Sequence, residues 1–161
     1  MSEAQHAADP ADATPDHKLT LRLWLRLLAC STLVEKTVRA RLTSEFDTTL
    51  PRFDVLAALE RCPKGLQLGE LSRYLLVSNG NVTGVIARLT AEGLVDRRVD
   101  ENDARVVRVS LTKTGREAFL EMAAAHEAWV EGLFEGLGHD DQAELLTLLT
   151  RLRRVLGEGT T

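Results

Sequence analysis

The sequence predicts a mainly α-helical protein with one small β-hairpin. Three observations lead to this fold class. Long stretches without Gly or Pro carry apolar residues at helical spacing near both ends of the chain, shorter helical stretches lie between them, and two Val-rich segments near residue 100 resemble paired strands. With 161 residues, of which 44% are hydrophobic, the chain is long enough to form the core of one domain.

The amino-terminal residues 1–17 are expected to lie outside this fold. They are rich in Ala, Asp, Pro and Thr and poor in large apolar side chains, which predicts a disordered arm. They lack the basic and apolar regions of a secretory signal peptide, and the longest apolar run, residues 27–34, is shorter than the roughly 20 residues of a membrane span. These features predict a cytoplasmic protein that does not enter a membrane.

Residues 19–46 are expected to form the first helix, a long one. They contain neither Gly nor Pro, and apolar residues such as Leu23, Leu27, Val34 and Val38 recur at helical intervals. A shorter helix is predicted to begin near Pro51, because proline is well suited to a first helical turn, and to end before Pro63.

A third and a fourth helix are predicted over residues 68–78 and 78–93. Ser78 is placed to cap the fourth helix. In that helix Val82, Val85, Ile86 and Leu89 fall on one face, which predicts contact with the core.

The opposite face of the fourth helix is made of small residues. It carries Gly80, Gly84 and Ala87, and it is flanked by the polar residues Asn81, Thr83 and Arg88. Each glycine costs a helix about 1 kcal/mol relative to alanine, so a close approach to a partner is one explanation for them. A DNA major groove admits such a helix, but packing against a neighbouring helix explains the glycines equally well.

Residues 93–99 and 105–111 are expected to pair as a hairpin, because both are rich in Val and they flank the turn sequence "DEND". Short helices followed at once by a hairpin are the parts of a winged helix-turn-helix, in which one helix reads DNA and the hairpin is the wing. Residues 50–111 are therefore predicted to be a DNA-binding lobe.

Two further helices are predicted over residues 112–137 and 139–156. Together with the first helix they are too long and too apolar to be covered by a small winged helix. A homodimer is the simplest way to bury them, so residues 18–48 and 112–157 are predicted to be dimerisation helices.

The distribution of charge supports a nucleic-acid partner. The chain has a net charge of −4, but residues 71–116 hold eight Lys and Arg against five Asp and Glu, a net charge of +3. Residues 117–161 hold nine acids against three arginines, a net charge of −6. A basic module in an acidic protein is consistent with binding to double-stranded DNA.

The segment from Ser78 to Arg116, with "GLVDR", an Asp-x-Arg wing tip and "LTKTGR", resembles the heart of MarR-family transcription regulators. The resemblance implies an obligate homodimer with a small-molecule pocket between the dimerisation helices and the DNA-binding lobe. It also implies that Arg105 enters the minor groove, that Asp103 orients it, and that Arg73 touches phosphate. In the commoner "DPxDRR" tip, Pro stands at the position of Glu101 and Arg at that of Ala104, so one wing cation is missing here.

The residues expected to bind DNA are therefore those of the fourth helix, its cap, the helix before it and the wing: Arg73, Ser78, Asn79, Asn81, Thr83, Gly84, Arg88, Asp103 and Arg105.

The stretches "LRLWLRLLACSTLVE", "TTLPRFDVL" and "VSNGNVTG" further resemble a branch of the family that controls the breakdown of aromatic acids and responds to hydroxycinnamoyl-CoA thioesters. Such an effector needs cations for its phosphates and an apolar slot for its aryl group. The candidate ligand-binding residues are Arg22, Trp24, Arg26, Arg39, Arg41, Arg52, Phe53, His126 and Trp129. The competing interpretation is that these are solvated arginines and packed core aromatics, with His126 satisfied in a helix interface.

Other classes of function are less well supported by the sequence. It has no phosphate-binding loop, nucleophile elbow or catalytic constellation, so no enzyme is predicted, and its four scattered histidines predict no metal site and no cofactor. Cys30 and Cys62 are expected to be buried reduced thiols. The prediction is a ligand-responsive repressor released from a pseudo-palindromic operator. A protein-interaction scaffold without DNA or ligand, and a thiol-based redox sensor, remain the alternatives.

Overall fold

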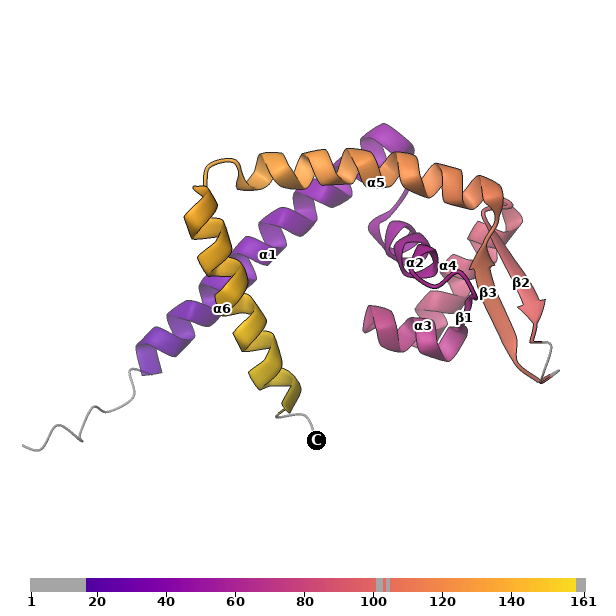
Figure 1. Ribbon diagram of the computed structural model, residues 1–161, viewed down its shortest axis with the longest axis horizontal. Coiled ribbons are helices and arrows are strands. Elements are labelled where there is room, and N and C mark those ends of the chain that lie inside the picture. Colours follow the sequence, from indigo (N-terminus) through magenta and orange to yellow (C-terminus); the bar gives the residue numbers. More distant parts are fainter. Residues whose placement is uncertain (1–16, 101–102, 104, 159–161) are drawn as a thin grey trace, which may run out of the picture. The chain divides into compact units, whose positions relative to one another are not determined.

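The computed structural model describes residues 17–100, 103 and 105–158 (Figure 1). Within these ranges, only the backbone of His17, Asn79 and Glu158 is described. The chain divides into two compact units, residues 1–35 and 36–161, and each is described by itself. Of the predicted arm, residues 1–16 lie outside the described residues.

The described residues confirm the predicted fold class, which is mainly helical with a small sheet. The helices are α1 (His17–Phe46), α2 (Leu50–Glu60), α3 (Leu68–Leu75), α4 (Asn79–Ala91), α5 (Lys113–Phe134) and α6 (His139–Glu158), and the strands are β1 (Leu66–Gln67), β2 (Val95–Val99) and β3 (Val107–Leu111). None of these helices is both long and apolar enough to cross a membrane.

The sheet contains one strand more than the predicted hairpin. Its order is β1-β3-β2, with all neighbours antiparallel. The short strand β1 pairs with β3 through Leu66 and Val109, and two residues are too few to give a periodic signal in the sequence. β1 ties the beginning of α3 to the wing.

The core of residues 36–158 lies where α2 packs against α3, α4 and α5, and where α4 meets β2 (Figure 1). Its largest fully buried side chains come from α2, α3, α4, β2, β3 and the second half of α1: Leu42, Val55, Leu56, Leu59, Leu71, Val82, Ile86, Leu89, Val95 and Val109. The apolar face predicted for α4 is thus the face it buries, with Val85 only half-buried at its edge.

Two local expectations need correction. Ser78 stands at the N-cap position of α4, but its side chain makes no capping hydrogen bond. Cys30 is exposed and Cys62 is half-buried, so neither is the fully buried thiol expected from the sequence. Cys30 lies in α1, and much of the apolar surface of that helix before residue 36 is exposed in the single chain, whereas Cys62 follows the end of α2.

Candidate DNA-binding surface and effector site

Helix α4 presents an open outer face to solvent. A Cβ atom added at Gly80 or at Gly84 would meet no atom of the described chain within 4 Å. Neither glycine is therefore required for packing inside the described chain. Close packing against a neighbouring helix, the alternative explanation for these glycines, does not occur within the described chain. The backbone of α4 is accessible at both positions, as a helix that enters a major groove requires.

The polar residues expected to flank this face are also accessible. Asn81, Thr83 and Arg88 are exposed, as is Ser78 at the N-cap, while Asn79 begins the helix and its side chain lies outside the described residues. Their roles in DNA binding remain predictions.

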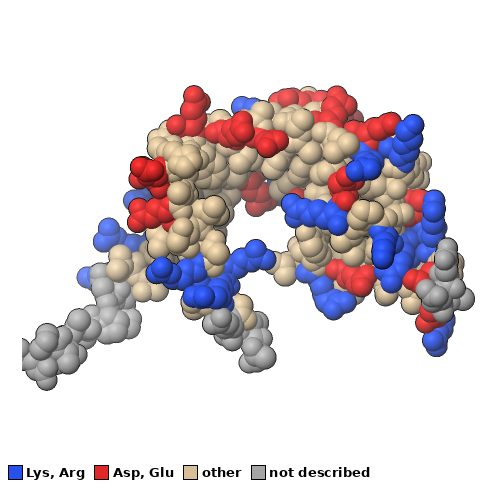
Figure 2. Space-filling model, viewed as in Figure 1, with Lys and Arg blue, Asp and Glu red and all other residues tan. Residues whose placement is uncertain are grey.

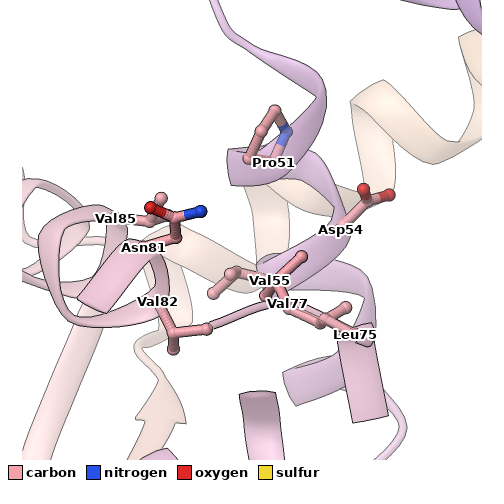
Figure 3. A pocket seen from close by; sticks show the side chains of 8 residues that line it. All are labelled: Pro51, Asp54, Val55, Leu75, Val77, Asn81, Val82 and Val85. Carbon is pink, nitrogen blue, oxygen red and sulfur yellow. The ribbon is translucent and has the colours of Figure 1, made fainter. Parts of the chain in front are cut away.

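Asn81 also borders a small cavity beside α4. This cavity, of about 270 Å³, lies between α2 and α4, and Figure 3 shows Asn81 and Asp54 as its polar residues among mainly apolar neighbours such as Val55 and Val82. The open outer face of α4 and its buried face therefore meet at this cavity.

Arg73 lies in the last turn of α3, where it is exposed. Its Nε donates a hydrogen bond to the carbonyl oxygen of Gly69 at 3.2 Å, which holds the stem of the side chain along the helix. An arginine in this position is accessible to a phosphate group.

The wing tip holds Arg105 in a defined orientation. Its Nε and a terminal guanidinium nitrogen donate to the two carboxylate oxygens of Asp103 at 3.1 and 3.2 Å, and its backbone N–H donates to the same carboxylate at 3.0 Å. These hydrogen bonds lower the pKa of Asp103, so the carboxylate remains charged. The Arg105 side chain is nevertheless 91% exposed. Glu101 and Ala104, at which this tip differs from the commoner "DPxDRR" sequence, lie outside the described residues.

Charge is unevenly distributed over the surface. Figure 2 shows Asp and Glu gathered along α5, while Lys and Arg gather around the sheet and also on the lower part of α6. This agrees with the net charge of +3 for residues 71–116.

Four of the predicted effector residues come together, in a cluster of Phe53, His126, Trp129 and Arg41. The ring of His126 stacks on Phe53 with centroids 4.9 Å apart, and its centroid lies 6.4 Å from that of Trp129. The Arg41 guanidinium lies 5.8 Å from the centre of the Trp129 ring, within the range of a cation–π interaction. Burial lowers the pKa of His126, which favours the neutral imidazole.

Arg52 lies outside this cluster, in a cavity of about 350 Å³ whose walls combine apolar side chains with three acids: Phe46, Leu56, Met122, Asp47, Glu92 and Glu121. It forms an ion pair with Glu92, the C-cap residue of α4. The Nε atom of Arg52 is buried and has no hydrogen-bond partner among the described residues. The cavity adjoins the aromatic cluster, because the ring of Phe46 lies 6.0 Å from that of Trp129.

The remaining predicted effector residues are exposed. Arg39 lies on the second half of α1, and Arg22, Trp24 and Arg26 belong to the unit that ends at residue 35. The structure therefore joins Arg41 to Phe53, His126 and Trp129, and places Arg52 with residues that the sequence did not single out. Within the described residues, no group of three His, Cys, Asp or Glu side chains could hold a metal ion.

Sequence reasoning missed Phe46 and Glu92. Phe46 ends the first helix and looks like any apolar core residue, and Glu92 is separated from Arg52 by 40 positions. No spacing rule connects residues so far apart, so only the packing of α2 against α4 brings them together.

Comparisons with known proteins agree with this arrangement. A family model described as MarR family matches residues 46–106. The transcriptional activatory protein BadR of Rhodopseudomonas palustris is 37% identical over 125 residues, which are 76% of this chain and 70% of that protein.

Solved structures show the same fold. A MarR family transcriptional regulator from Silicibacter pomeroyi is 30% identical, covers 89% of this chain and 99% of its own, and superimposes with a TM-score of 0.75. A cysteine-to-serine mutant of MarR from E. coli, complexed with operator DNA, is 26% identical, covers 86% of this chain and 99% of its own, and has a TM-score of 0.73. The chain belongs to the MarR family of transcriptional regulators.

Proposed function

We propose that the protein is a cytoplasmic, homodimeric and ligand-responsive regulator in which α4 enters the major groove of an operator and Arg105 enters the adjacent minor groove. The observation that carries the proposal is the wing tip, where Arg105 is 91% exposed and is oriented by Asp103. The two α4 helices of a dimer would bind half-sites about 10 bp apart. A protein-interaction scaffold would need neither this arginine nor the open glycine face of α4.

Apolar surface left uncovered in the single chain supports the dimer. Large apolar side chains are exposed on α1 and, separately, on α6: Leu19, Leu23, Leu33, Leu146, Leu148 and Leu156. Exposed apolar residues along long helices are what a homodimer interface buries.

DNA binding can be tested with a duplex that the protein selects from a random-sequence library. We expect Arg105→Ala to weaken binding and to flatten its dependence on salt by about one counterion per subunit, because the contact is mainly electrostatic. Lys113→Ala is the matched control, since Lys113 is an equally exposed cation outside the wing. A salt slope unchanged by Arg105→Ala would rule out the minor-groove contact.

We further propose that the effector is an aromatic acid or its CoA thioester, and that its aryl part occupies the cavity beside Arg52. The volume of about 350 Å³ suits an aromatic acid and is close to the lower end for ligand pockets. It is too small for a whole CoA thioester, whose nucleotide would extend into solvent. The guanidinium of Arg52, which lines the cavity, supplies donors for the carboxylate or carbonyl oxygen of the ligand.

The ion pair between Arg52 and Glu92 suggests how the effector would act on α4. A ligand oxygen that takes Arg52 competes with Glu92, which would lose its partner at the end of the reading helix. This shifts the protein away from DNA only if the ligand binds the released state more tightly than the DNA-bound state.

The effector proposal is tested by titrating free hydroxycinnamic and benzoic acids and their CoA thioesters into the complex with the selected duplex. Release by any of them, lost in Arg52→Met, would support the site, and release by none would refute it. Expression of a reporter gene placed behind the selected duplex, with and without the protein, shows whether the protein represses or activates transcription. We propose repression, whereas the relative BadR is named as an activator.

A further inference from the structure

Arg108, on β3, is bonded to acceptors from three other parts of the lobe. Its Nε donates to a carboxylate oxygen of Asp100 at 2.6 Å, and one terminal nitrogen lies 3.8 Å from the carboxylate of Glu70 and 3.5 Å from the carbonyl oxygen of Gly65. The Arg108 and Asp100 side chains are only 36% and 16% exposed. Arg108 is therefore partly covered by these groups, whereas Arg105 is almost fully exposed.

Sheet pairing alone does not favour an arginine at this position. In the register of the two strands Arg108 is directly opposite Arg98, and like charges in this relation destabilise a sheet. Each arginine has its own carboxylate, Asp96 for Arg98 at 2.8 Å and Asp100 for Arg108. Asp100 and Glu70 offset the repulsion between the two arginines, and they fix the orientation of the Arg108 side chain.

The partners of Arg108 are themselves fixed. Glu70 belongs to the capping box of α3, where one of its carboxylate oxygens accepts a hydrogen bond from the backbone N–H of Gln67 at 2.8 Å. The backbone N–H of Asp100 donates to the carbonyl oxygen of Val106 at 2.8 Å, which closes the base of the wing loop. Arg108 thus joins the first turn of α3 to the base of the loop that carries Arg105.

We propose that Arg108 is a positioning residue for DNA binding, which holds the wing at a fixed angle to α3 and α4 so that Arg105 reaches the minor groove while α4 is in the major groove. The proposal rests on the DNA-binding role of Arg105 proposed above. In this proposal Arg108 acts through the wing and not by contact with DNA, because its Nε is hydrogen-bonded to Asp100 and one of its terminal nitrogens faces Glu70 and Gly65.

A double-mutant cycle on the selected duplex tests this role. Arg105→Ala and Arg108→Met are each expected to weaken binding about tenfold, and the double variant is expected to bind no more than about twofold more weakly than Arg105→Ala alone. The two effects are not expected to multiply, because a wing that lacks Arg105 has no DNA contact for Arg108 to position. Lys113→Met controls for the loss of one positive charge.

Two further variants separate positioning from a general effect on folding. Asp100→Asn keeps the size of the side chain and should weaken binding as Arg108→Met does, with no loss of helical circular dichroism and little change in the melting temperature. Arg108→Lys retains a cation for Asp100 and should restore most of the affinity.

Several outcomes would overturn the proposal. Independent effects of Arg105→Ala and Arg108→Met, which multiply to about a hundredfold in the double variant, would make Arg108 a DNA contact of its own. Normal DNA binding by Asp100→Asn would mean that the contacts of Arg108 stabilise the fold and do not position the wing. Normal binding by Arg105→Ala would instead refute the proposed wing contact, and with it the basis for this inference.

Discussion

The backbone of Gly115 lies against the carbonyl group of Leu94, so closely that a Cβ atom at residue 115 would be 1.8 Å from the Leu94 oxygen. The same oxygen accepts a hydrogen bond from the backbone N–H of Thr112 at 3.1 Å, and the Thr112 hydroxyl oxygen accepts one from the backbone N–H of Gly115 at 2.9 Å. The "LTKTG" sequence is therefore the junction at which α5 begins against Leu94, the residue before β2. It links the wing to a long helix.

Gly115→Ala is expected to lower the free energy of unfolding by about 2 kcal/mol, because the added methyl group overlaps a backbone carbonyl that has no flexible end to move aside. Urea denaturation measures the change. Gly132→Ala is the matched control in the same helix, where a Cβ meets no described atom within 4 Å and where alanine should stabilise the helix by up to about 1 kcal/mol. Equal effects of the two substitutions would contradict the close packing at Leu94.

Gly84→Ala is expected to separate stability from function. The position is open inside the described chain, so alanine should raise the free energy of unfolding by about 1 kcal/mol. The methyl group would at the same time keep the α4 backbone away from the floor of the groove and weaken binding to the selected duplex. Gly132→Ala should give the stability gain without the loss of affinity. An unchanged affinity for Gly84→Ala would mean that α4 does not bind DNA by this face.

Arg88→Ala is expected to reduce discrimination between the selected duplex and an unselected duplex of the same length. Arg88 is exposed in the last turn of α4, beside the open glycine face, where an arginine can reach base edges. Loss of one base contact should weaken binding to the selected duplex by about 1–3 kcal/mol and leave binding to the unselected duplex less affected. Equal weakening on both duplexes would make Arg88 a phosphate contact.

His126 is expected to make stability depend on pH. Burial lowers its pKa below the ordinary value of 6.5, so the unfolded chain takes up a proton at a higher pH than the folded chain does. The free energy of unfolding should therefore fall as the pH drops below about 6.5, and the contribution should be fully present above it. Denaturation at about pH 7.5 and 5.5 measures this difference. His126→Gln should reduce the difference, whereas substitution of the exposed His139 should not.

The aromatic cluster shows the limits of periodicity. Phe53, His126 and Trp129 were candidates because of their residue types, yet nothing in their spacing indicates that His126 stacks on Phe53. Arg52 was grouped with them, but it lies in a cavity beside the cluster, with Glu92 as its partner. Contacts between separate helices depend on how their faces pack, and no local pattern records this.

The helices, the hairpin, the buried face of α4 and the basic middle of the chain could be predicted from the sequence, because helical spacing, strand alternation and charge are local properties of neighbouring residues. The open α4 glycines, the pairing of β1 with the wing and the connection of Asp100 to Glu70 through Arg108 are seen only in the folded chain. These features join residues far apart in the chain. They exist only once apolar burial has fixed α2, α3, α4 and the sheet against one another.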